Sequence, residues 1–107
     1  MTDLRASLRA EIVLRERMAS AIPLSATAHE ILLQVALARV EGRRVSIVGA
    51  AGPSSTALRH VALLVEAGLI EREPSRADRR SVWLSITDEG FARVAALFGA
   101  PVLARVA

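Results

Sequence analysis

The sequence contains no cysteine, no lysine and no tyrosine, and aromatic residues make up only 3% of its 107 residues. Without cysteine the chain can form no disulfide, no cysteine-based zinc site and no thiol nucleophile. Hydrophobic residues are nevertheless 52% of the chain, so we predict an aliphatic, alanine-rich core, which favours helices over a β-sandwich. A chain of this length is expected to fold as one domain, residues 1–107, around one modest core.

Long uncharged apolar runs are also missing. No such run approaches the roughly 18 residues that a membrane span requires, so we predict no membrane association. Charged residues are spread through residues 1–22, and the apolar segment of a signal peptide is not seen there. We therefore expect a cytoplasmic protein.

The motifs of common catalytic sites are absent as well. The segment Gly49-Ala50-Ala51-Gly52 lacks the lysine that follows a glycine-rich phosphate loop. The sequence has no His-x-x-x-His pair and no serine in a nucleophile elbow. His29 and His60 lie far apart in the sequence without an obvious acidic partner set, and we expect His29 to be a solvated or packing residue. We therefore predict no enzymatic activity, no catalytic residue, no metal site and no cofactor.

The positive charge of the chain comes entirely from arginine. All fourteen basic residues are arginines and the net charge is +3, which by itself is weak evidence for a nucleic-acid partner. Their placement is more informative, because Arg76, Arg79 and Arg80 share the polar segment 75–80, where only Asp78 opposes them.

One helix is strongly marked at residues 54–67. Pro53 is well tolerated at a helix start, and the residues after it satisfy the free N–H groups of a first turn. Gly68 stands where a left-handed C-cap would end the helix. The helical period predicts a buried stripe of Leu58, Val61, Ala62 and Val65. The residues off this stripe are Ser55, Thr56, Arg59, His60 and Leu63.

Two strands follow this helix. Residues 69–73 form a short strand that Pro74 ends, and in residues 82–86 Val82, Leu84 and Ile86 alternate with Trp83 and Ser85. The order of helix, strand, basic turn and strand is typical of a recognition helix followed by a wing. We expect Trp83 to pack against the wing or a helix rather than to stack on a base.

The helices at the start of the chain are predicted at residues 2–22 and from Ser25 to Gly42. The first has an apolar stripe of Leu4, Leu8, Ile12, Ala19 and Ile22, which could pack in the core or against a second subunit. The second begins at Ser25, or at Thr27 with Glu30 completing a capping box. Its predicted buried residues are Ile31, Leu32, Val35, Leu37 and Ala38.

Two segments complete the chain. Residues 45–52 allow two interpretations: a short helix capped by Ser46, which would make 46–67 a helix-turn-helix, or a strand at 45–49 that pairs with the wing. A last helix is predicted to begin after its N-cap, Thr87, and to place Phe91, Val94, Ala95 and Phe98 at helical spacing. Residues 99–107 form a short tail.

Residues 24–98 resemble the MarR-type winged helix-turn-helix family of bacterial transcription regulators. The resemblance rests on three segments in order, Glu66-Ala67-Gly68-Leu69-Ile70-Glu71-Arg72, Asp78-Arg79-Arg80, and Leu84-Ser85-Ile86-Thr87-Asp88-Glu89-Gly90. It implies a mostly α fold with a small β-wing, extended by helices at both ends. It also implies a homodimer on palindromic double-stranded DNA, with helix 54–67 in the major groove and wing 74–81 at the minor groove.

The resemblance and the chemistry of the side chains together give a set of candidate DNA contacts. Carried over by position, the recognition helix would contact bases or phosphates, and Arg80 would enter the minor groove, braced by Asp78. Arginine suits guanine edges, phosphates and narrow minor grooves. The candidates are Ser54, Ser55, Thr56, Arg59 and His60 in the helix, Arg76, Arg79 and Arg80 in the wing, and Arg43 and Arg44 before it.

The chain departs from the family at its ends. Its C-terminal part is shorter than the long helices that usually knit the dimer and line an effector pocket, and nothing in the sequence supports a small-molecule effector. The first helix is then the candidate for dimerisation, through Leu4, Leu8 and Ile12. The alternative function is a winged-helix protein–protein interaction module that does not bind DNA.

Overall fold

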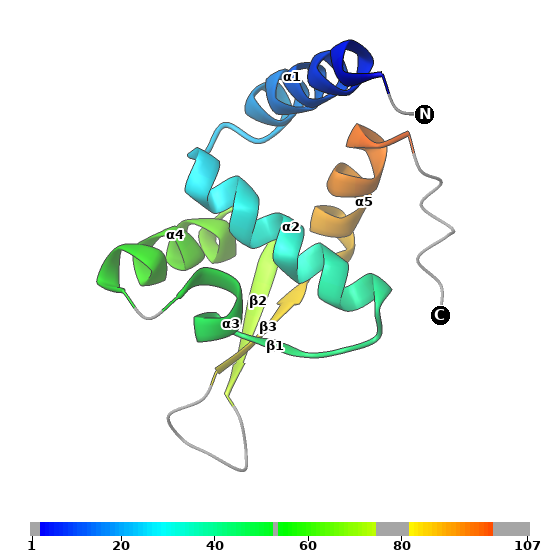
Figure 1. Cartoon of the computed structure of the whole chain (residues 1–107). Coiled ribbons are helices and arrows are strands. Elements are labelled where there is room, and N and C mark those ends of the chain that lie inside the picture. The colour runs from blue at the N-terminus through cyan, green and yellow to red at the C-terminus, as the bar shows by residue number, and fades with distance from the viewer. Residues whose placement is uncertain (1–2, 53, 75–81, 100–107) are drawn as a thin grey trace.

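A computed structural model describes residues 3–52, 54–74 and 82–99 of the chain (Figure 1). The described residues form five helices and a small sheet, which confirms the predicted fold class. The elements in chain order are α1 (Leu4–Ala21), α2 (Ala26–Val40), β1 (Val45–Ser46), α3 (Ile47–Ala51), α4 (Ser55–Glu66), β2 (Ile70–Pro74), β3 (Val82–Ile86) and α5 (Asp88–Leu97).

Each helix begins after a short polar side chain that accepts a hydrogen bond from its first turn. Asp3 caps α1, and the other four helices are capped by a serine or threonine that accepts from the N–H three residues on. These bonds satisfy N–H groups that have no partner within the helix. Ser25 caps α2, so the alternative cap at Thr27 is wrong. Gly42 and Gly68, with φ of 67° and 77°, follow the ends of α2 and α4 as predicted.

The sheet has the strand order β1-β3-β2, and both pairs are antiparallel. Val45 pairs with Leu84, and Ile70 pairs with Ile86. Both interpretations of residues 45–52 are therefore partly correct. Val45 and Ser46 pair with the wing strand, and the Ser46 side chain then caps α3 by accepting from the N–H of Gly49 at 3.0 Å.

The core is aliphatic and lies between α2, the sheet, α4 and α5, with α2 running across the middle of the molecule (Figure 1). Among the described residues, no polar or charged residue is buried. Ile31, Leu32, Val35 and Ala38 face inward as predicted. Leu37 does not: it is 46% exposed, because its position between Ala36 and Ala38 turns it to the opposite side of α2.

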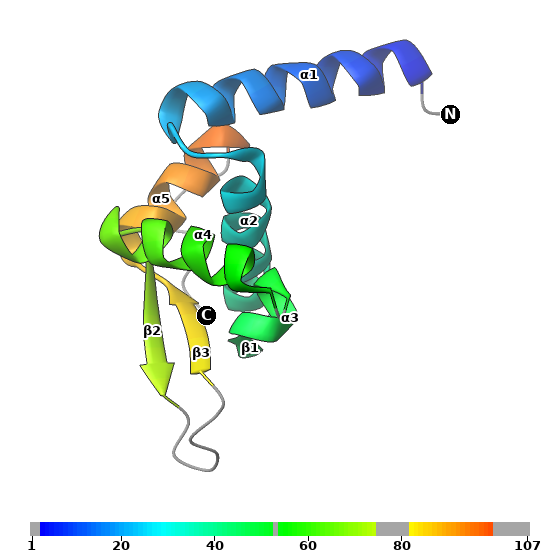
Figure 2. The ribbon, with the colours of Figure 1, turned by 90° about the vertical axis from the view of Figure 1, so that its left-hand side faces the viewer.

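Among the described residues, α1 packs against the rest of the chain mainly through its second half, where Leu14 is partly buried. Met18 and Ile22 are buried, whereas Leu4, Leu8 and Ile12 are 71%, 55% and 55% exposed. Figure 2 shows the first turns of α1 extending beyond the other helices. Packing within this core therefore does not account for these three side chains, and Ala19, predicted in the same stripe, is also exposed.

The two ends of the wing meet at one junction between α4 and α5. The Thr87 hydroxyl donates to the carbonyl oxygen of Gly68 at 2.7 Å, and the Thr87 N–H donates to that of Leu69 at 3.0 Å. The same hydroxyl accepts from the N–H of Gly90 at 2.9 Å, as the N-cap of α5. The two sequence segments around Gly68 and Thr87 are thus brought together in space.

Within the described residues, no single helix has the length and apolar character to cross a membrane. The pair α1 and α2 passes such a test only when taken together, and it is bent by 99° at its break.

Candidate nucleic-acid interface

The recognition helix α4 is held against α2 by one apolar face. Ala57, Val61 and Leu64 are buried, at i, i+4 and i+7 spacing. The predicted stripe is therefore correct for Val61 and partly correct for Val65, which is half-buried against the core. It is wrong for Leu58, which is 47% exposed, and for Ala62, which is exposed. The small side chain of Ala57, rather than the larger Leu58, faces the core at the start of α4.

The opposite face of α4 carries the predicted polar residues into solvent. Ser55, Thr56 and Arg59 are exposed, and Ser54 is the N-cap, with its hydroxyl 3.1 Å from the N–H of Ala57. The other N–H groups of this first turn have no carbonyl partner within the helix, and groups of this kind bind phosphate at helix starts. Arg59 has no hydrogen-bond or ion-pair partner within the described part of the chain, so its guanidinium is available to a ligand.

His60 differs from its neighbours on this helix. It is half-buried, and its Nδ1 lies 3.1 Å from the hydroxyl oxygen of Ser25, the N-cap of α2. The imidazole thus already has a partner inside the chain. Its predicted contact with DNA stays a prediction, and that contact competes with this internal bond.

The exposure of Leu58 on α4 was not predicted. Leu58 lies beside Arg59 on the solvent side of α4, where an aliphatic group could contact a thymine methyl. Sequence periodicity assigned it to the core because leucine is the residue type most often placed there. The neighbouring alanine gave no signal that it would take the inward position instead.

The two arginines before β1 are exposed but already engaged. The Arg43 Nε donates to Glu41 Oε1 at 2.6 Å, with both side chains about half exposed. The Arg44 guanidinium lies over the Trp83 ring, 5.6 Å from its centroid. This contact shows Trp83 packing beside the wing, in line with its predicted role. Both arginines keep a positive charge at the base of the wing.

The wing itself extends past α3 and away from the helical core (Figures 1 and 2). Its strands keep continuous antiparallel register from Ile70–Ile86 to Pro74–Val82. Arg76, Arg79, Arg80 and Asp78 lie outside the described residues, so their roles stay predictions from the sequence. The preceding helix-turn-helix consists of α3, the turn at Gly52 with φ of 88°, and α4.

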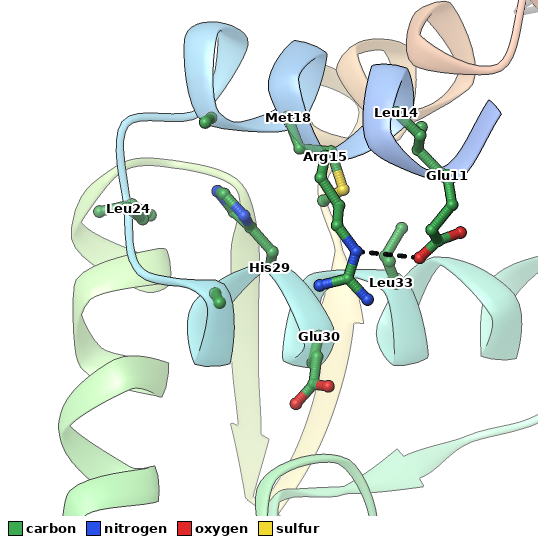
Figure 3. Close-up of a pocket in the computed structure, with 10 residues that line it drawn as sticks. Glu11, Leu14, Arg15, Met18, Leu24, His29, Glu30 and Leu33 are labelled. Carbon is green, nitrogen blue, oxygen red and sulfur yellow. Dashed lines mark hydrogen bonds and ion pairs between the residues drawn. The ribbon is translucent and has the colours of Figure 1, made fainter. Parts of the chain in front are cut away.

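A cavity of about 290 Å³ lies on the other side of the molecule, between α1 and α2 (Figure 3). Leu14, Met18, Leu24 and Leu33 form apolar parts of its lining, and the Glu11–Arg15 ion pair of 3.0 Å lies at its edge. His29 also lines it and contacts the carbonyl oxygen of Ile22 at 2.7 Å, which makes it a packing residue. Among the described residues, no group of three or more His, Cys, Asp and Glu could hold a metal ion.

Comparison with known proteins agrees with this geometry. Residues 41–90 match the winged helix DNA-binding domain family. A search of curated protein sequences finds no match. Among solved structures, the chain is similar to the S. aureus MepR–DNA complex, with a TM-score of 0.71 and 14% identity over 89% of this chain and 77% of that chain.

Two further solved structures are similar. Wild-type apo MarR from E. coli has a TM-score of 0.66 and 18% identity over 92% of this chain and 76% of that chain. The transcriptional repressor CouR, bound to a 23-mer DNA duplex, has a TM-score of 0.63 and 25% identity over 89% of this chain and 66% of that chain. Of these three structures, those of MepR and CouR contain DNA, and CouR is a transcriptional repressor. Residues 41–90 thus match the winged helix DNA-binding domain family, and the chain as a whole shares the fold of the MarR, MepR and CouR structures.

Proposed function

We propose that the protein is a homodimeric transcription regulator that binds operator DNA, with α4 in the major groove and wing residues 74–81 at the minor groove. The observation that carries the proposal is the division of α4 into two faces. Ala57, Val61 and Leu64 fix the helix on α2, while Thr56 and Arg59 remain in solvent at its capped start. This is the arrangement in which a helix enters a major groove.

The residues of the interface take different roles in this proposal. Arg59 contacts a base edge, where a bidentate arginine–guanine pair discriminates by about 1–3 kcal/mol. Ser54, Ser55 and Thr56 bind phosphate together with the free N–H groups of the helix start. Arg76, Arg79 and Arg80 bind the minor groove and its phosphates, and Arg43 and Arg44 supply phosphate contacts at the base of the wing.

The second copy of the chain is needed because one α4 covers only half of a palindromic site. The exposed apolar row of Leu4, Leu8 and Ile12 on α1 is the surface we assign to that contact. Its side chains lie in solvent in the single chain, at exposures unusual for three large aliphatic residues in one row. Acting on DNA in this way, the protein works in the bacterial cytoplasm.

The test is a mobility shift on DNA selected from a random pool, repeated over a range of salt concentrations. Arg59→Ala should relax base preference at one position in each half-site and leave the other positions unchanged. Arg80→Ala should weaken binding to all sequences and lower the slope of log affinity against log salt by about one for each phosphate that is no longer neutralised.

Arg93→Ala provides the matched control, since it removes the same charge from α5, where Arg93 pairs with Glu89 at 3.0 Å. This variant should bind as the wild type does. Binding by the Arg59 and Arg80 variants that equals the control would refute the assigned contacts. A wild-type protein that shifts no DNA even at low salt would support the protein-interaction module instead.

A further inference from the structure

Both histidines of the chain contact residues 22–25, the short connection between α1 and α2. His29 contacts the carbonyl oxygen of Ile22 through Nε2 at 2.7 Å, and His60 contacts the Ser25 hydroxyl through Nδ1 at 3.1 Å. Since a carbonyl oxygen can only accept, Nε2 of His29 carries a proton. The connection is therefore bonded to α2 through His29 and to α4 through His60.

Ser25 has two simultaneous roles in this arrangement. Its hydroxyl oxygen accepts from the N–H of Ala28 at 3.2 Å, which caps α2. Its single proton can then be donated to Nδ1 of His60, so that one hydroxyl satisfies the start of α2 and a side chain of α4 together. Removing either partner therefore removes a bond that joins the two helices.

The hydrogen bond between Ser25 and His60 adds a directional interaction to the apolar packing of α4. Ala57, Val61 and Leu64 hold α4 in place by burial, which sets the side of α4 that faces inward but tolerates small rotations about the helix axis. A hydrogen bond weakens steeply as its angle changes, so the Ser25–His60 pair limits rotation of α4. Arg59 is the adjacent residue in the chain, and any rotation of α4 moves its side chain relative to the DNA.

We propose that His60 is a positioning residue, which with Ser25 sets the orientation of the recognition helix and joins it to the connection that carries α1. The inference rests on the proposed function for its DNA measurements. It assigns His60 a role other than a base contact. Movement of α1 relative to the core then changes the presentation of Arg59 through Ile22–Ser25 and His60.

The experiment is a double-mutant cycle of Ser25→Gly and His60→Ala. Glycine is chosen because it is nearly as good an N-cap as serine, and it removes the hydroxyl together with the one carbon that carries it. Each single variant should bind selected DNA about threefold to tenfold more weakly, the range expected when one hydrogen bond is removed, and the double variant should bind no more weakly than either. The salt slope should not change, because the side chains proposed to touch phosphates are all retained.

Conservative variants separate positioning from other roles. The amide of asparagine reaches about as far as Nδ1, and that of glutamine about as far as Nε2, so His60→Asn should restore affinity while His60→Gln should not. Ser46→Gly is the control for capping, since Ser46 caps α3 and contacts no histidine. Combined with His60→Ala, it should give additive reductions in affinity.

Two results would overturn the inference. One is a His60→Ala variant that relaxes preference at a single base pair while Ser25→Gly binds normally, which would make His60 a base contact. The other is additive behaviour of Ser25→Gly and His60→Ala in amide hydrogen exchange of residues 22–29 and 59–64. Exchange is measured without DNA, so it tests the Ser25–His60 bond even if the wild type binds no operator. We expect each single variant to raise exchange there by about threefold to tenfold, and the double variant to raise it no further.

Discussion

Gly90 is the position at which the structure makes its sharpest prediction about stability. It lies in the first turn of α5, where a Cβ atom would come 2.2 Å from the carbonyl oxygen of Leu69 and 3.0 Å from Cγ1 of Ile86. The first of these atoms is backbone and is fixed by the N–H of Thr87, which donates to it at 3.0 Å. Gly90→Ala therefore cannot be accommodated by a rotamer change and must displace α5 from the start of β2.

The magnitude follows from two opposing effects. Overpacking of this kind costs about 1–3 kcal/mol, and a clash with fixed backbone belongs in the upper part of that range. Alanine regains up to about 1 kcal/mol because it is the better helix former. The net loss should be about 1–2 kcal/mol in the free energy of unfolding, which for a domain of this size lowers Tm by about 5–15 °C.

Gly49 offers a matched control within the same chain. It occupies the same place in α3 that Gly90 occupies in α5, three residues after a hydroxyl cap that its N–H contacts at 3.0 Å. A Cβ there would meet only side-chain atoms, Ser46 Oγ at 3.3 Å and Val45 Cγ2 at 3.5 Å. Gly49→Ala should leave stability unchanged or raise it by up to about 1 kcal/mol.

Urea denaturation followed by far-ultraviolet circular dichroism, at one fixed protein concentration, measures both variants. Helix propensity and capping affect the two substitutions alike, so the difference between them isolates the contact with Leu69. Equal effects in the two variants would show that α5 does not approach β2 as closely as the structure indicates. A large difference with unchanged m-values would support the close approach.

Two further variants test other parts of the fold. Thr87→Val keeps the shape of the side chain but removes the cap of α5 and the hydrogen bond to Gly68. It should lower the free energy of unfolding, measured by urea denaturation, by about 1–2 kcal/mol. Thr87→Ser keeps the hydroxyl and should lower it much less. Leu8→Asp should leave the protomer folded, because Leu8 is 55% exposed. It should weaken dimerisation at least about tenfold in sedimentation equilibrium, which is the effect expected for a residue buried in an interface. Ser20→Asp, an exposed position outside the apolar row, is its control, and a dimer that tolerates Leu8→Asp would show that the interface lies elsewhere.

Much of the fold could be predicted from the sequence because its boundaries depend on local chemistry. The caps at Ser25, Ser54 and Thr87 and the turns at Gly42 and Gly68 act within one turn of chain, so their residue types specify them directly. The alternation of residues 82–86 predicted the buried face of β3 for the same reason.

The errors have a different origin, since they concern which side of a helix faces the core. Leu37 and Leu58 are exposed, while Ala38 and Ala57 take the inward positions beside them. Hydrophobicity alone ranks leucine above alanine for burial, but closely packed helices can leave room only for the smaller side chain. The Ser25–His60 contact was not predicted because the two residues are distant in the sequence and become neighbours only after folding.

The junction at Thr87 gives a structural role to two of the three segments that carry the resemblance to MarR-type regulators, namely those outside the wing turn. The overall identity to the similar solved structures is 14% to 25%. Within the sequence, the segments around Gly68-Leu69 and Thr87–Gly90 resemble the family pattern. In this chain those segments contact one another, through Thr87 on Gly68 and through the close approach of Gly90 to Leu69. These segments join the end of α4 to the start of β2 and the end of β3 to α5. Each strand has five residues and rises about 3.3 Å per residue, so a small change in the angle of the hairpin at this junction displaces the far ends of both strands. We therefore predict that these segments set the angle between α4 and the β2–β3 hairpin. If the protein binds DNA as proposed, variants at Thr87 should alter DNA affinity although Thr87 is not among the proposed DNA contacts.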